Sequence, residues 1–129
     1  MHVAFDDLDG QALDWAAAYT LSLSLTEGRV ILARDLANTA IRNGAAFSSR
    51  PGDAEHLIRR GQIQVSEEAP GSFLAQCRPY AWDPTRVVKA RGSKAVVAAL
   101  RCYVRAGFPG SDGIDVPTEL VSEIQSPGM

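Results

Sequence analysis

The sequence has little of what several common functions need. It holds two histidines and two cysteines in 129 residues. No apolar run approaches the roughly 20 residues that a membrane-spanning helix requires. The N-terminus also lacks the basic segment followed by an apolar one that marks a secretory signal. We therefore expect a cytoplasmic protein with no membrane segment.

The few histidine and cysteine side chains also argue against a metal or catalytic site. Cys77 and Cys102 are too few and too far apart in sequence for a disulfide framework or a Cys-x-x-Cys metal site. His56 is flanked by Glu55 and is not offset by three or four residues from a second ligand. A cysteine nucleophile activated by His56 is the less favoured alternative, because a buried neutral thiol is inert. We expect two buried thiols, no metal ion, no cofactor and no enzymatic activity.

The composition is that of an ordinary folded domain. Hydrophobic residues make up 46% of the chain and charged residues 22%, which is typical of globular proteins. A chain of this length can bury a core without disulfides or metals to hold it together. We expect one domain spanning residues 1–129, with residues 1–5 and 125–129 frayed.

Charge is distributed unevenly along the chain. Residues 1–28 carry five acidic residues, residues 29–105 carry all 13 basic residues and six acidic ones, and residues 106–129 carry four acidic residues. Most of the basic residues are arginine, a side chain suited to bidentate contacts with phosphate or carboxylate; a GC-rich genome would also raise the arginine content. The basic middle either pairs with the acidic ends or offers a basic face to a partner.

The stretch ALDWAAAY, residues 12–19, predicts a long helix. Its apolar residues recur at the three-and-four spacing of one helical face, and Asp9 is a suitable N-cap. Trp15 shares that face and is expected in the core. Asp14 lies about 100 degrees away around the helix and need not share this burial. An exposed Asp14 would be a solvated charge or a partner for an arginine of the stripe formed by residues 94, 101 and 105.

A second long helix is predicted after Ser93, which is a suitable N-cap. The body of this helix is almost wholly apolar and Gly107 is the expected C-cap. Lys94, Arg101 and Arg105 are spaced so that they form one narrow polar stripe along it.

Residues 62–78 give the clearest β pattern. Apolar and polar residues alternate on both sides of the Pro70-Gly71 turn, which predicts a hairpin with one face toward water. Residues 86–88 could add a third strand, and Trp82 is large enough to close one end of the core. The expected inward positions of the hairpin are Ile63, Val65, Phe73, Ala75 and Cys77.

Shorter segments carry weaker signals. The run RVIL, residues 29–32, predicts a strand. Residues 35–43 are either a helix capped by Asp35 or a hairpin with DLAN as its turn. Short helices are expected over residues 53–61 and 116–124, and a flexible loop over residues 109–115. Together the elements predict an α+β fold of a single domain, with two long helices packed on a small antiparallel sheet that contains a β-hairpin.

A local excess of basic residues gives one candidate binding surface. Residues 78–105 carry seven basic residues and a single acidic one, Asp83. No recognisable nucleic-acid-binding motif accompanies this excess, and the acidic ends would partly neutralise it. The surface comprises Lys89 and Arg91 together with the residues that we take as candidate macromolecule contacts: Arg59, Arg60, Arg78, Arg86, Lys94, Arg101 and Arg105.

Two separate segments resemble a known family. LDGQALDWAAA at residues 8–18, and GSKAVVAALRCYVRAG followed by IDVPTEL within residues 92–120, are similar to the patterns of a NinX-like family of small phage- and prophage-encoded proteins. The middle of the chain departs from the family by lacking a tryptophan and paired glycines after Asp53, and by having residues 93–95 in place of a proline-containing turn. The resemblance implies a phage or prophage origin and a shared fold, and it brings no activity with it. The matching positions are Leu8, Gly10, Ala12 to Ala16, Ala98 to Val104, Val116, Pro117, Glu119 and Leu120.

The leading hypothesis is therefore a phage-derived accessory protein. It would act without catalysis as a binding module for a host or phage macromolecule, with an unknown host or phage protein as the partner. The alternative is a nucleic-acid-binding protein that uses a basic surface within residues 78–105. An enzyme has the least support in the sequence.

Overall fold

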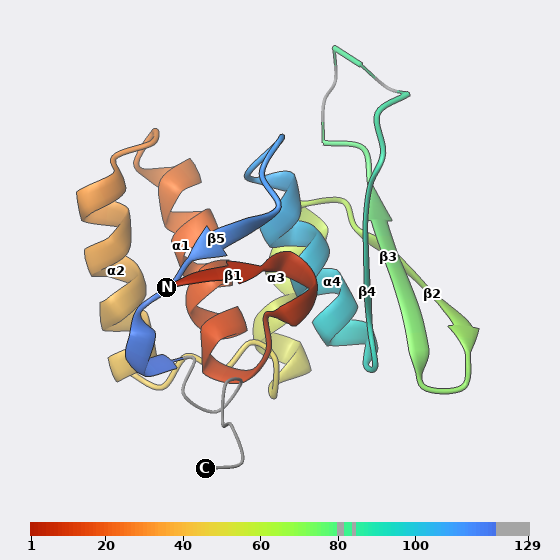
Figure 1. Cartoon of the computed structure of the whole chain (residues 1–129), viewed down its shortest axis with the longest axis horizontal. Helices are drawn as coiled ribbons and strands as arrows, with labels where there is room; N and C mark the ends of the chain where they lie inside the picture. Colours follow the sequence, from red (N-terminus) through yellow and green to blue (C-terminus); the bar gives the residue numbers. More distant parts are fainter. Residues whose placement is uncertain (80–81, 84, 121–129) are drawn as a thin grey trace.

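Four helices and two small antiparallel sheets form a single α+β domain, which confirms the predicted fold class (Figure 1). The computed structural model describes residues 1–79, 82–83 and 85–120. Strands β2, β3 and β4 form one sheet in that order, and β1 pairs with β5 in the other. The elements are β1 His2–Ala4, η1 Phe5–Asp7, α1 Gly10–Leu25, α2 Val30–Arg42, α3 Pro51–Arg60, β2 Gln64–Ala69, β3 Ser72–Cys77, β4 Val88–Gly92, α4 Ala95–Ala106, β5 Gly113–Asp115 and η2 Thr118–Leu120.

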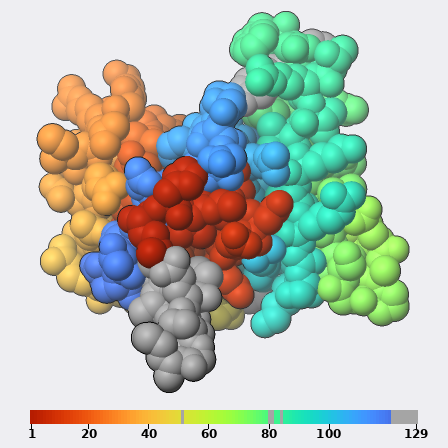
Figure 2. Space-filling view, in the orientation of Figure 1, coloured from red at the N-terminus to blue at the C-terminus, as the bar shows by residue number. Residues whose placement is uncertain are grey.

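Helix α1 lies in the middle of the molecule. It packs against α2 on one side and α4 on the other, and α4 in turn packs on β3 and β4. The β1–β5 ribbon crosses in front of α1 (Figure 1). In the space-filling view the N-terminal segment lies at the surface between α2 and the three-stranded sheet (Figure 2). Because α1 is covered on several sides, every residue from 12 to 20 is buried.

The start and the core role of α1 agree with the sequence prediction. The side chain of Asp9 caps the helix by accepting a hydrogen bond from the backbone N–H of Gly10 at 2.9 Å. Trp15 is fully buried and stacks on Tyr19 with 5.0 Å between ring centroids. Its indole Nε1 donates a hydrogen bond to Oδ1 of Asn38 on α2 at 2.8 Å. The same side chain therefore fills the core and ties α1 to α2.

Asp14 is buried, so neither alternative for an exposed side chain applies. Its side chain is neither solvated nor paired with an arginine but is 4% exposed. The carboxylate accepts a hydrogen bond at 2.7 Å from the backbone N–H of Ser48, in the loop between α2 and α3. Burial is the main influence on this group and raises the pKa of Asp14 above its ordinary value, while the hydrogen bond from Ser48 opposes the rise.

Helix α4 and the hairpin form where the sequence predicts them. Helix α4 ends at the expected C-cap, Gly107, but its N-cap position is Lys94 and not Ser93. Strands β2 and β3 meet at the Pro70-Gly71 turn, where Gly71 has a φ of 75° that glycine adopts without strain. Residues 88–92 supply the third strand, paired antiparallel with β3.

The inward face of the hairpin is only partly as predicted. Ala75 and Cys77 of β3 are buried beneath α4, but Val65 of β2 is exposed. Strand β2 is the outer edge of the sheet, and α4 lies mainly over β3 and β4. Alternation alone does not reveal how far across the sheet the covering helix reaches.

The run RVIL is the start of α2 and not a strand. Val30, Ile31 and Leu32 are all exposed, and α2 buries only its small residues Ala33 and Ala37 against α1. A short apolar run cannot distinguish a strand from a helix. The helical reading of residues 35–43 is confirmed over the hairpin alternative, although Asp35 lies inside α2 and does not cap it.

The N-terminus and the segment before residue 116 are more ordered than predicted. Residues 1–5 do not fray, because β1 pairs with β5 and places Val3 and Phe5 in the core. The pairing brings the backbones so close that a Cβ at position 113 would clash with the carbonyl of Val3, which explains Gly113. A β5 strand thus replaces part of the predicted loop over 109–115.

Three smaller predictions also need correction. Trp82 does not close the core but is 75% exposed. Helix α3 begins at Pro51, two residues before the predicted cap Asp53, because proline suits the first helical position. A short 3-10 helix, η2, stands at the start of the predicted segment 116–124. Its remainder, and the expected fraying of residues 125–129, fall outside the described residues.

Replacement of Trp15 tests the contact between α1 and α2. We expect Trp15→Ala to lower the free energy of unfolding by about 3 to 5 kcal/mol, because a buried aromatic side chain leaves a cavity. Asn38→Ala should cost about 0.5 to 1.5 kcal/mol, because the indole N–H loses its acceptor. Urea unfolding followed by circular dichroism measures both. In a Trp15→Phe background, which has no N–H to satisfy, Asn38→Ala should cost almost nothing. An equal cost in both backgrounds would refute the link.

Replacement of Asp14 by asparagine tests the cost of its buried charge. The pKa of Asp14 is raised in the folded protein, so the folded state binds the proton more tightly than the unfolded state does. Wild-type stability must then fall as pH rises from 3.8, the ordinary value, through the raised one. Asparagine does not titrate, so the stability of Asp14→Asn relative to wild type should increase over that interval. Unfolding curves across pH, with exposed Asp35→Asn as the charge control, measure the difference. A constant difference would contradict the prediction.

Candidate functional site

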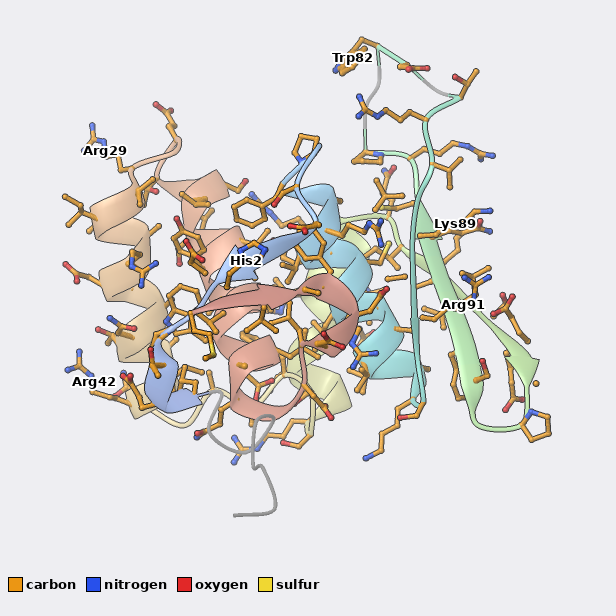
Figure 3. All side chains as sticks on the ribbon, in the orientation of Figure 1. His2, Arg29, Arg42, Trp82, Lys89 and Arg91 are labelled. Carbon is orange, nitrogen blue, oxygen red and sulfur yellow. The ribbon has the colours of Figure 1, made fainter. Side chains whose placement is uncertain are left out.

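Strand β4 presents two cations on the surface. Lys89 and Arg91 are exposed, and Ala90 between them is buried against α4, as the alternation of a strand requires. Figure 3 shows both cations along β4, on the opposite side of the molecule from Arg42 of α2 and from Arg29, which precedes that helix. Strand β4 is also an edge strand of its sheet. Its second edge faces η1 and α4 and carries no strand in the described chain.

Helix α4 brings Arg101 to this edge. The Nε of Arg101 donates to the carbonyl of Leu8 at 2.8 Å, and its Nη1 donates to the carbonyl of Arg91 at 2.9 Å. The side chain therefore links α4, the segment before α1 and the edge of β4. Both acceptors are neutral carbonyl groups, so these bonds orient the guanidinium without cancelling its charge.

Arg105 lies one helical turn beyond Arg101 on α4. Its guanidinium sits over the ring of Phe5 in η1, with the carbon Cζ 5.9 Å from the ring centroid. The side chain is exposed, yet the ring restrains its direction. A cation held in this way loses less conformational entropy on binding an anion than a freely moving one does.

These cations line two adjoining hollows of about 380 and 590 Å³. Lys89, Arg91 and Arg105 border both, Arg101 borders the first and Arg86 the second. We call the two hollows and these five cations the β4 groove. Among the described residues that line it, Asp6 is the only acid. The loop after α4 lines the second hollow with Phe108, Pro109, Gly110 and Ser111.

One cation of the β4 groove is compensated by a carboxylate from β2. Arg91 Nε lies 2.8 Å from Oε1 of Glu68. The hydrogen bond from Arg91 lowers the pKa of the Glu68 carboxyl, and the same bond raises the pKa of Arg91. Both side chains face solvent, so an anionic ligand can compete with Glu68 for the guanidinium.

The β4 groove gathers only part of the predicted surface. Arg86, Arg101 and Arg105 line it, but Lys94 does not. The other three predicted arginines lie elsewhere. Arg59 pairs with Glu55 within α3, Arg60 Nη2 donates to Ser24 Oγ at 3.2 Å, and Arg78 borders a separate hollow beside Gln62, Gln64 and Gln76.

Lys89 and Arg91 are central to the groove and were left out of the candidate contacts. The possible third strand over residues 86–88 was misplaced, because β4 begins only at Val88 and runs through the KARG that follows. Two cations separated by one small apolar residue must point to the same side of a strand. Recognising the full length of β4 would have placed both.

Neither a metal centre nor a membrane span emerges from the described chain. Within residues 1–79, 82–83 and 85–120, no three His, Cys, Asp or Glu side chains gather closely enough to hold a metal ion. Across the same ranges, each helix is too short or too polar to cross a bilayer.

A further surface feature lies on α2, far from the groove. Its outward side chains include Ile31, which is 81% exposed, and the less exposed Val30, Leu32 and Leu36; Leu25 at the end of α1 is also exposed. Apolar side chains gathered in this way are typical of contact surfaces for other proteins.

Comparison of this chain with protein-family models, with curated proteins and with solved structures finds no match in any of the three.

Proposed function

We propose that the protein is a non-catalytic binding module whose β4 groove binds the sugar-phosphate backbone of a nucleic acid. The observation that carries this proposal is the convergence of five cations from β4, α4 and the segment before β4, with one lining acid among them. Phosphate contacts from Lys and Arg supply most of the affinity of sequence-independent nucleic-acid binding. The groove has this chemistry without a recognisable base-reading motif.

The side chains in the groove suit phosphate in particular. Four of the five cations are arginine, whose planar guanidinium donates two parallel hydrogen bonds to an oxyanion. Arg101 is held by two backbone carbonyls and Arg105 by the ring of Phe5, so both are oriented before a ligand arrives. Two adjoining hollows also suit a chain of phosphates better than a single small anion.

Single strands are the preferred form of the nucleic acid in this proposal. The loop that connects β3 to β4 carries Trp82 at its tip, above Lys89 and Arg91 (Figure 3). Trp82 is 75% exposed. Bases stack on exposed aromatic side chains only when they are free of a duplex, and each stack contributes about 1 to 3 kcal/mol.

The resemblance to NinX-like phage proteins supports an accessory role, and we propose a phage or prophage origin on that ground. A host or phage protein is the second candidate partner. The apolar surface of α2 favours it, because Val30, Ile31, Leu32 and Leu36 would lose contact with water in a complex. This surface lies away from the β4 groove, so the two kinds of partner do not compete.

Removal of single cations tests the groove. We expect Lys89→Ala and Arg105→Ala each to weaken binding of a labelled single-stranded oligonucleotide about fivefold at 0.1 M salt, because one phosphate contact is lost. The slope of log affinity against log salt should fall by about 0.7 for each variant. Fluorescence anisotropy across a salt series measures both quantities.

Arg42→Ala is the matched control, because it removes the same charge from α2 on the opposite side of the molecule (Figure 3). An equal loss of affinity in Arg42→Ala would show that net charge, and not the groove, attracts the ligand. Absence of any binding at low salt would overturn the proposal itself.

Removal of Glu68 should have the opposite effect. In Glu68→Gln the Arg91 guanidinium loses its carboxylate partner and becomes available to phosphate. We expect binding about fivefold tighter at 0.1 M salt and a salt slope steeper by about 0.7. The neighbouring Glu67→Gln removes the same charge without breaking a described ion pair, and should change affinity less. Equal gains in the two variants would contradict a specific role for Arg91.

A further inference from the structure

The two cysteines of the chain are in contact. Cys77 lies at the end of β3 and Cys102 in the middle of α4, and their Sγ atoms are 3.6 Å apart. Both thiols are reduced and buried, with 5% of Cys77 and none of Cys102 exposed. The sequence predicted two buried thiols, and this is confirmed. The two cysteines are 25 positions apart in the sequence, and no local signal indicated that they would meet.

The environments of the two thiols differ. The Sγ of Cys102 lies 3.5 Å from the carbonyl oxygen of Val88 and 3.6 Å from the Sγ of Cys77, so its hydrogen can be donated to either. Donation from Cys102 stabilises a thiolate at Cys77 and lowers the pKa of Cys77. The pKa of Cys102 is raised, first by the contact with Cys77 and then by burial. The contact therefore favours a thiolate at Cys77 over one at Cys102.

Cys77 is also the accessible member. It lines a hollow of about 460 Å³ whose walls include Leu23, Ile63 and Tyr103. On another side it lines a hollow of about 400 Å³ together with Gln76 and Arg78. Cys102 lines neither of them. A small molecule that enters either hollow therefore reaches Cys77 first, and its low exposure excludes a bulky one.

We propose that Cys77 and Cys102 form a redox-active dithiol, which a small peroxide entering through these hollows converts into a disulfide. The site is independent of the nucleic-acid groove proposed above. Its chemistry needs one nucleophilic thiol open to the oxidant and a second thiol in contact with it, and the pair provides both.

The reaction balances in two steps. The Cys77 sulfur attacks one oxygen of hydrogen peroxide, the O–O bond breaks, and the departing hydroxide takes up the thiol proton to form water. Cys77 is then a sulfenic acid. The Cys102 sulfur next attacks the Cys77 sulfur, an S–S bond forms, the S–O bond breaks, and the hydroxyl group leaves with the Cys102 proton as a second water. Two thiols are oxidised and one peroxide is reduced.

The geometry allows bond formation with local movement. A disulfide requires the sulfur atoms to approach to about 2.05 Å, from 3.6 Å in the dithiol. Cys102 gives up its contact with the Val88 carbonyl as it does so. The new bond joins β3 to α4 and closes a loop that would otherwise gain entropy on unfolding.

Peptide mapping of the peroxide-treated full-length protein tests the proposal. Folded wild-type protein is exposed to hydrogen peroxide, the remaining thiols are alkylated in denaturant, and the peptides are separated without reductant. We expect one peptide pair linked through Cys77 and Cys102, formed faster than in denatured protein, together with a rise in the melting temperature that a reductant reverses. The proposal is overturned if both thiols stay free, if the cysteines link separate chains, or if the folded protein reacts no faster than the denatured one.

Two single variants assign the roles. Cys102→Ser should leave Cys77 as a sulfenic acid, because the second thiol is missing. Dimedone added together with denaturant traps this acid, since the folded protein admits only small molecules to Cys77. Cys77→Ser should leave Cys102 unmodified at the same peroxide concentration. Trapping at Cys102 in the second variant would reverse the assignment and overturn the proposed order of attack. Circular dichroism confirms that each variant is folded, and the mapping of wild-type protein needs neither variant.

Discussion

The packing around α1 is the constraint on which the rest of the structure depends. This helix has no exposed face over residues 12–20, and α2 and α4 pack against it. The small residues Ala33 and Ala37 of α2 are buried, and the guanidinium of Arg34 lies over the Trp15 ring, with Cζ 5.1 Å from the ring centroid. The hydrogen bond from Trp15 to Asn38 satisfies the single polar atom of this side chain at the edge of the core.

The segments next to α1 also position two cations of the β4 groove. Arg101 reaches from α4 to the carbonyl of Leu8, directly before the N-terminus of α1, and to the carbonyl of Arg91. Arg105 lies against Phe5, which is buried because β1 pairs with β5. Two cations of the groove are thus positioned by residues 5–8, a segment that has no basic residue and was expected to include part of a frayed end. The acidic N-terminal segment and the basic middle of the chain contact each other here through the carbonyl of Leu8 and the ring of Phe5.

Local sequence signals predicted the elements whose own residues decide their structure. Asp9 caps α1, Gly107 ends α4, and the Pro70-Gly71 turn sets the hairpin, because capping and turn formation depend on nearest neighbours. The β1–β5 pairing and the contact between Cys77 and Cys102 depend on tertiary packing instead. Nothing within a window of the sequence could specify them. The prediction of a strand for RVIL was wrong for a related reason. The three apolar side chains of this run are exposed, and the buried face of the helix is formed by the alanines that follow.

The candidate site was likewise predictable only in part from the sequence. Composition identified the basic region between residues 78 and 105, yet could not separate Arg78, which borders a different hollow, from Arg86, which borders the groove. The distinction depends on the positions of both residues around the β3–β4 connection relative to α4, and it becomes visible only when the three-stranded sheet is placed.

Helix α4 contributes to both sites, because Arg101 and Cys102 are neighbours that project about 100 degrees apart around its axis. One contacts the edge of β4 and the other the end of β3, so the groove and the thiol pair lie on different faces of the same helix.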